Sequence, residues 1–233
     1  MQKRIWELDA LRGLFVLGMV VVHFVYDLVE LWGIVQWEYP AAFLLVKDWG
    51  GLLFLLISGI CVTLGHRSVR RGAIVLACGA VISAVTVGMY WLRLSDRGII
   101  IYFGVLHCLG VSMLLWPLLK KWPWQALLAL AAALLALGYW FGTLRLGSNW
   151  LLAFNLRSDS FASSDYFPLL PDFGWFLLGA VLGKTLYRRK RSVLPNARCQ
   201  FRPLQAVGRH SLEIYMLHQP VLSGICYLLA LLK

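Results

Sequence analysis

The sequence predicts an all-α polytopic membrane protein, a helical bundle of about seven transmembrane helices with a cytoplasmic N-terminus. Apolar residues make up 60% of the 233 residues and charged residues only 14%, and the mean hydropathy is +0.72. Soluble domains have about 45–50% apolar and about 25% charged residues. The apolar residues also gather in runs of about 20, the length at which a helix crosses a hydrocarbon core of about 30 Å.

Seven runs of this kind follow one another, joined by short loops and without an internal repeat. The charged N-terminal stretch shows no small-residue cleavage site after its apolar run, so we expect an uncleaved first helix. A single integral membrane domain over residues 1–233 is therefore predicted. The expected spans are residues 11–32, 49–66, 72–92, 99–119, 123–143, 168–187 and 211–232.

The net charge of +11 indicates topology rather than nucleic-acid binding. With the N-terminus inside, sixteen of the 22 Lys and Arg residues fall on the cytoplasmic side and six outside. This is the direction of the positive-inside rule. The expected partners are membrane lipids, and no nucleic acid is predicted.

Ionisable residues run along one side of the first span. Arg12 lies eleven residues before His23, Asp27 four after it and Glu30 seven after it, so helical periodicity places all four within about 40° of one face. Charged groups in a span face a bundle interior or a wet cavity. A carboxylate one turn from an imidazole can orient it and raise its basicity, which favours His23 as a general base or nucleophile and Asp27 as its orienting group.

Two further histidines occur in later spans, His107 in the fourth and His218 in the last. Gln219 follows His218, and Pro220 removes the hydrogen-bond donor of a carbonyl one turn earlier. Three histidines at different depths predict a polar route across the membrane. The alternative is that each histidine only packs helices together, since polar contacts between membrane helices contribute about 0.6 kcal/mol on average.

Acidic and aromatic residues gather at the expected outer ends of the spans. These are Glu30, Asp48, Trp49 and Asp172, and they favour binding of an amine or a polyhydroxy acceptor. The five cysteines are scattered without a ligand spacing, so no metal site is predicted. Gly50, Gly51 and Gly59 in the second span favour close helix packing.

Three stretches carry a resemblance to a known family: RIWELDALRGLFVLGMVVVHFVYDL, YFGVLHCLGVSMLLW and GRHSLEIYMLHQPVL. The chain resembles the small bacterial relatives of the heparan-alpha-glucosaminide N-acetyltransferase catalytic domain, within the wider transmembrane acyltransferase group. The resemblance covers Arg4 to Val221. It implies a bacterial cytoplasmic (inner) membrane enzyme that moves an acetyl group from cytoplasmic acetyl-CoA to an amino sugar or another acceptor outside.

Residue by residue, the opening motif of the family matches Asp9, Arg12 and Gly13, with His23 at its polar position. The Leu-His motif matches His107, and the closing motif matches His218 and Gln219. The loop WGIVQWEYPAAFLLVKD lacks the histidine that the larger eukaryotic members carry after their first helix. His23 is therefore the expected replacement.

The leading hypothesis is acyl transfer from a CoA thioester, with acetyl-CoA as acyl donor. Catalysis is assigned to His23, Asp27 and His107, with His107 or Gln219 polarising the carbonyl oxygen. Cofactor binding is assigned to basic and polar residues expected on the donor's route: Arg12, Arg70, Arg71, Lys120, His218 and Gln219. No glycine-rich phosphate loop supports the CoA assignment.

Two alternatives remain open. A proton-coupled small-molecule transporter explains the histidine and aspartate stripe equally well, although transporters often show paired halves that this chain lacks. A noncatalytic assembly subunit predicts that the polar positions tolerate apolar replacement. A homodimer is also left open, as are the acceptor's identity and the choice between a covalent acyl-histidine and direct transfer.

Overall fold

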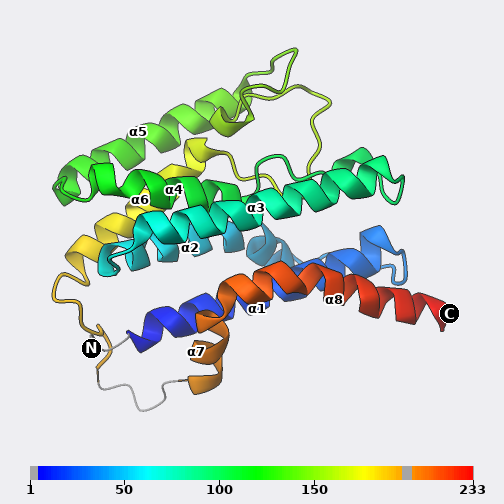
Figure 1. The fold of residues 1–233 in the computed structure, drawn as a ribbon, viewed down its shortest axis with the longest axis horizontal. Helices are drawn as coiled ribbons and strands as arrows, with labels where there is room; N and C mark the ends of the chain where they lie inside the picture. Colours follow the sequence, from blue (N-terminus) through cyan, green and yellow to red (C-terminus); the bar gives the residue numbers. More distant parts are fainter. Residues whose placement is uncertain (1–4, 196–200, 233) are drawn as a thin grey trace. The chain divides into compact units, whose positions relative to one another are not determined.

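The computed structural model describes residues 5–195 and 201–232. In these ranges the chain forms eight α-helices with short 3-10 and π segments between them (Figure 1). They divide into two compact units. Unit 1 contains residues 5–54, 191–195 and 201–232, and unit 2 contains residues 55–190.

Unit 1 is built on α1 (Trp6–Tyr26), which continues as a π-helical turn (Asp27–Leu31). The other elements are α7 (Arg202–Arg209), α8 (Ser211–Leu231) and the first part of α2 (Ala41–Leu64). In Figure 1, α1 and α8 lie side by side and run in the same direction. The apolar side chains of Leu14 and Val21 on α1 are exposed, as expected for a lipid-facing side.

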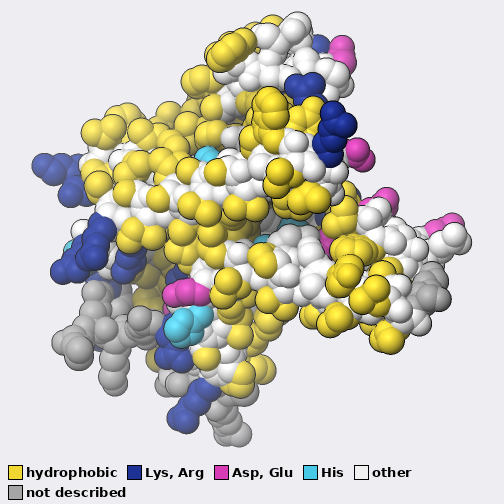
Figure 2. Space-filling model, turned by 45° about the vertical axis from the view of Figure 1, so that its right-hand side comes forward, with side chains coloured by type: hydrophobic (Ala, Val, Ile, Leu, Met, Phe, Trp, Pro, Cys, Tyr) yellow, Lys and Arg dark blue, Asp and Glu magenta, His cyan; other side chains and the backbone are white. Residues whose placement is uncertain are grey.

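Unit 2 contains the remainder of α2, then α3 (Ser68–Trp91), α4 (Val105–Leu119), α5 (Trp124–Thr143) and α6 (Leu169–Thr185). Short 3-10 turns occur at Arg97–Ile99 and Leu152–Phe154. Phe176, Leu127 and Leu177 are fully buried. Hydrophobic side chains cover much of the face seen in Figure 2.

All seven predicted spans contain a helix, and five of the described helices are long and apolar enough to cross a membrane: Trp6–Leu31, Ala41–Leu64, Ser68–Trp91, Trp124–Thr143 and Ser211–Leu231. The helix α4 has 15 residues and α6 has 17, fewer than the roughly 20 that a full crossing needs. The expected count of seven and the cytoplasmic N-terminus stay predictions. Among the residues used in the charge count, Lys3, Arg4, Arg198 and Lys233 lie outside the described ranges.

Two helix starts differ from the sequence prediction. The α2 helix begins at Ala41 rather than near residue 49, because the helix continues through the charged Lys47 and Asp48 that a hydropathy window treats as its end. The helix α4 begins at Val105 rather than at Ile99. The apolar residues before it are extended, and Phe103 forms an isolated bridge with Tyr166.

Close backbone contact joins α2 to α6 within unit 2. A Cβ atom placed on Gly59 would overlap the carbonyl oxygen of Phe176, and one on Gly179 would overlap that of Leu56. The packing role expected of Gly59 is therefore confirmed, whereas a Cβ atom on Gly50 would meet nothing within 4 Å. Glycine at these crossings lets membrane helices approach by van der Waals contact.

We expect Gly59→Leu to destabilise the protein strongly, because the new side chain displaces the α6 backbone and forces the helices apart. Overpacking of a core costs about 1–3 kcal/mol and sometimes more. Thermal unfolding in detergent measures the loss. Gly50→Leu is the matched control, since it adds the same side chain to the same helix, and an equal loss in both variants would contradict this packing role.

Candidate functional site

Three polar contacts in unit 1 join α1 to α8. Arg12 Nη2 donates to Ser211 Oγ over 2.6 Å. The rings of His23 and His218 meet edge to face, with centroids 4.9 Å apart. Gln219 Nε2 donates to Asp27 Oδ1 and Oδ2 over 2.9 Å each. Residue numbers rise together along both helices, so α1 and α8 are parallel, and the polar face predicted for α1 meets a matching polar face of α8.

Each histidine of the pair is oriented by a carbonyl of its own helix. His23 Nδ1 lies 2.9 Å from the Met19 oxygen, and His218 Nδ1 lies 2.6 Å from the Tyr215 oxygen. A carbonyl only accepts, so Nδ1 carries the proton in both rings, and in the neutral form Nε2 keeps its lone pair. Both rings can therefore accept a hydrogen bond or a proton at Nε2.

Asp27 is fully buried, and both of its carboxylate oxygens accept from Gln219. The expected orienting bond from Asp27 to His23 is replaced in the structure by the bond to the Met19 carbonyl. Asp27 fixes the Gln219 amide instead, which turns Oε1 of Gln219 away from the carboxylate. Both Gln219 Oε1 and His218 Nε2 are buried without a hydrogen-bond partner, and such acceptors in a native structure call for an explanation such as a ligand or a water.

The polar stripe ends at Asp27, one turn before its predicted end. Residues Asp27–Leu31 form a π-helix, whose wider turn shifts the helical register. Glu30 is exposed, and its Oε1 accepts from the Tyr39 hydroxyl over 3.3 Å. The prediction that Glu30 shares the face of His23 and Asp27 is therefore wrong.

The short helix α7 packs directly against the start of α1. A Cβ atom on Gly13 would overlap the Leu204 carbonyl oxygen, and one on Gly208 would overlap that of Asp9. Glycine at these two positions allows α7 to cross α1 beside Arg12. Gly13 belongs to the opening motif, whereas sequence reasoning did not identify Gly208.

A buried carboxylate also anchors the chain before α7. Glu7 is 6% exposed. Its two oxygens accept from Ser192 Oγ over 2.8 Å and from the Val193 amide over 2.7 Å. Sequence reasoning missed this contact, because a glutamate near a chain end reads as a solvated charge.

In unit 2, His107 is the third residue of α4, whereas the expected span begins at Ile99 and places it eight residues in. Its Nδ1 accepts from the Gly104 amide over 3.3 Å, and its Nε2 lies 3.4 Å from Ser83 Oγ, which donates to the Ile101 oxygen over 2.5 Å. A Cβ atom on Gly79 would lie 3.1 Å from the ring. Both ring nitrogens of His107 thus have protein partners, and the residue caps α4.

The long segment between α5 and α6 is fastened to the same end of α4. Asp165 Oδ2 accepts from the Val105 amide over 3.1 Å, and Ser163 Oγ donates to the Ile100 oxygen over 2.8 Å. The Tyr166 hydroxyl donates to the Leu152 oxygen over 2.8 Å, and burial raises the pKa of Tyr166 to about 12. This segment is held in place by hydrogen bonds to the start of α4 and to Ile100 before it, and by one within itself.

The acceptor residues predicted at the outer ends occupy different environments. Asp48 and Trp49 are exposed and lie within α2 rather than at its outer end. Asp172 is 5% exposed and lies in the first turn of α6. Their shared role in substrate binding stays a prediction.

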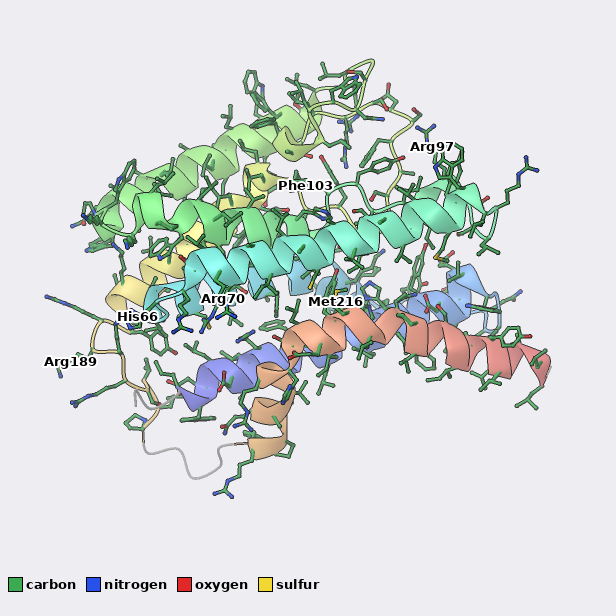
Figure 3. The ribbon with its side chains drawn as sticks, viewed as in Figure 1. His66, Arg70, Arg97, Phe103, Arg189 and Met216 are labelled. Carbon is green, nitrogen blue, oxygen red and sulfur yellow. The ribbon has the colours of Figure 1, made fainter. Side chains whose placement is uncertain are left out.

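A basic cavity of about 380 Å³ opens in unit 2 where α2, α4 and α6 end and α3 begins. Lys120, a predicted cofactor-binding residue, lines it, and Arg71 lies beside the lining residue Gly65. Figure 3 labels His66 and Arg70 at this end of α3 and Arg97 at the other. The lining residues are Thr63, Gly65, His66, Ser68, Trp116, Lys120, Lys121, Lys184 and Lys190.

Long apolar helices with a partly buried seam of imidazole, carboxylate and amide groups define a helical membrane protein with an intramembrane polar site. In the described part of the chain, no three His, Cys, Asp or Glu side chains come together as a metal site requires. Residues 4–220 match the family described as heparan-alpha-glucosaminide N-acetyltransferase, catalytic, and the chain belongs to this family. Comparisons with curated proteins and with solved structures found no match.

Family membership confirms the resemblance to this catalytic domain and indicates a membrane acetyltransferase. The transporter alternative is therefore not favoured. Within the matched range lie the whole α1 face and the α8 residues Ser211, His218 and Gln219 that meet it.

Proposed function

We propose that the protein transfers an acetyl group from acetyl-CoA to an amine or hydroxyl acceptor, such as an amino sugar, on the outer side of the membrane. The observation that carries the proposal is the contact between His23 and His218, both with an unprotonated Nε2 in the neutral form. Family membership indicates that the transferred group is acetyl. The intramembrane position of the pair suits a reaction between groups that arrive from opposite sides.

The chemistry assigned to His23 is general-base catalysis. Its Nε2 takes the proton from the acceptor nitrogen or oxygen while that atom attacks the thioester carbonyl carbon. The carbon–sulfur bond then breaks, and the proton passes from the imidazolium to the departing thiolate, which leaves as the free thiol of CoA. Proton transfer by a positioned side chain contributes about 10²–10⁴-fold to a rate.

The acceptor group is held by the other residues of the seam. Gln219 Oε1 and His218 Nε2 are acceptors without a donor. A primary amine has two N–H bonds, so one can bond to either of these acceptors while the other faces His23 Nε2, whereas a hydroxyl has only the one proton that His23 takes. N-acetylation is therefore the preferred form of the reaction. Asp27 acts as a positioning residue, because its carboxylate holds the Gln219 amide in the required orientation.

The donor's phosphates are assigned to the cytoplasmic basic residues Arg12, Arg70, Arg71 and Lys120, through charge-assisted hydrogen bonds. Arg12 already donates to Ser211, and a guanidinium carries further N–H groups for a phosphate. The bacterial inner membrane and the cytoplasmic N-terminus belong to the same proposal.

The deciding experiment uses the purified protein in liposomes with acetyl-CoA labelled in its acetyl group and a panel of amino sugars and polyols. We expect label in the amine products, with release of free thiol in equal amount. Flux of an intact solute without any labelled product would support the transporter and contradict the enzyme.

For His107 we propose a positioning role at the start of α4. His107→Leu removes the partner of the Gly104 amide, so we expect a loss of about 1–3 kcal/mol in the free energy of unfolding. The remaining folded protein should keep most of its turnover per active molecule. A variant that unfolds like the wild type but loses turnover a hundredfold would restore His107 to the catalytic set.

A further inference from the structure

The basic cavity of unit 2 carries an inference of its own. Five of its lining side chains are basic: His66, Lys120, Lys121, Lys184 and Lys190. None of the described lining residues is acidic, so no carboxylate of the lining neutralises them. Lysines that crowd round an open cavity repel one another unless an anion lies between them.

The geometry of Lys184 adds structure to this cluster. Its Nζ donates to the Lys120 oxygen over 2.8 Å and to the Trp122 oxygen, and it lies 5.9 Å from the centre of the Trp116 ring. These contacts fix the ammonium at the end of α4. An ammonium has three N–H bonds, so one remains for a ligand in the cavity.

Neutral donors and a helix start complete the lining. Ser68 is the first residue of α3, and no side chain caps that end of the helix, so amides of the first turn are without intrahelical partners. Together with the lysines, they offer several N–H and O–H groups to an anion with several oxygens. Phosphate has this form, and a carboxylate of similar size has fewer oxygens to receive them.

We propose that this cavity is a phosphate-binding site, which takes either the phosphorylated end of the acyl donor or the headgroup phosphate of an anionic lipid. The first source rests on the proposed function, and the second does not. Both fit a cavity at the level where several helices end, because basic pockets between membrane helices hold anionic headgroups at that level. The new residues assigned to phosphate are His66, Lys121, Lys184 and Lys190.

The test replaces two exposed lysines whose removal leaves the Lys184 contacts intact, in the variant Lys121→Gln/Lys190→Gln. Arg93→Gln/Arg97→Gln is the matched control, since it removes the same charge from the other end of α3. Lys121→Arg/Lys190→Arg is the rescue variant. Calorimetry measures binding of pyrophosphate, CoA and dephospho-CoA, and mass spectrometry of protein from nanodiscs measures retained phosphatidylglycerol against phosphatidylcholine.

We expect the Gln variant to bind pyrophosphate at least about tenfold more weakly, because it loses two charge-assisted hydrogen bonds to the anion. The control and the rescue variant should bind like the wild type. A parallel loss for CoA identifies the donor as the source, and a selective loss of retained phosphatidylglycerol identifies the lipid. Equal binding of every probe by wild type and Gln variant overturns the site.

Pyrophosphate and lipid binding need no turnover, so they separate this inference from the proposed function. If binding depends on the lysines but the protein shows no transferase activity, the phosphate site is supported and the proposed acetyl transfer is contradicted. If the protein transfers acetyl groups but the Gln variant binds the probes like the wild type, the proposed acetyl transfer is supported and the phosphate site is contradicted.

Discussion

His23→Ala should lower acetyl transfer by about a hundredfold or more, because it removes the base that takes the acceptor's proton. The fold should tolerate the change. His23 Nδ1 bonds to the Met19 carbonyl of its own helix, and loss of a local side-chain bond at this position leaves the backbone of α1 unaltered. Turnover with labelled acetyl-CoA and thermal unfolding are the two measurements.

His210→Ala is the matched control. It removes an exposed histidine of unit 1 whose ring lies 3.8 Å from Glu213, and we expect it to leave turnover unchanged. Added imidazole should restore part of the activity of His23→Ala if the residue acts as a base. Full activity in His23→Ala would rule out its catalytic role, and a parallel loss of stability and activity would support helix packing instead.

The first span shows how far periodicity predicts a site. Helical spacing correctly placed Arg12, His23 and Asp27 on one face, and the structure finds partners for all three on α8. It failed at Glu30, because a π-helical turn begins at Asp27 and no residue in that stretch marks the change. Residue spacing therefore predicts a shared face only where the helix is a regular α-helix.

Periodicity does not predict which α8 residues contact the α1 face, because these contacts join residues far apart in the sequence. His107 shows how a helix start can be misplaced. Apolar residues run from Ile99 through Phe103, so hydropathy does not reveal that α4 begins only at Val105. A histidine at a helix start is therefore easily taken for one in mid-span. Sequence reasoning missed the basic cavity for another reason. Each of its lysines, taken alone, is explained by the positive-inside rule.

Gln219→Leu should be the most destabilising of the single changes in the seam. It leaves the fully buried Asp27 carboxylate without the amide that donates to both of its oxygens. Loss of one partner of a buried polar pair costs about 1–3 kcal/mol, and more when the group left behind is charged. The change also removes Oε1, so the acceptor should bind more weakly and its KM should rise.

A double variant tests whether the loss comes from the broken Asp27–Gln219 pair or from the new leucine at position 219. Removing both partners, in Asp27→Leu/Gln219→Leu, leaves no buried charge, so the double variant should unfold at a higher temperature than Gln219→Leu alone. Gln125→Leu on α5 is the control for the amide itself, since Gln125 is exposed. Additive losses in the double variant would show that Asp27 and Gln219 act independently, and the Gln219 amide would then need another reason for its orientation toward the histidine pair.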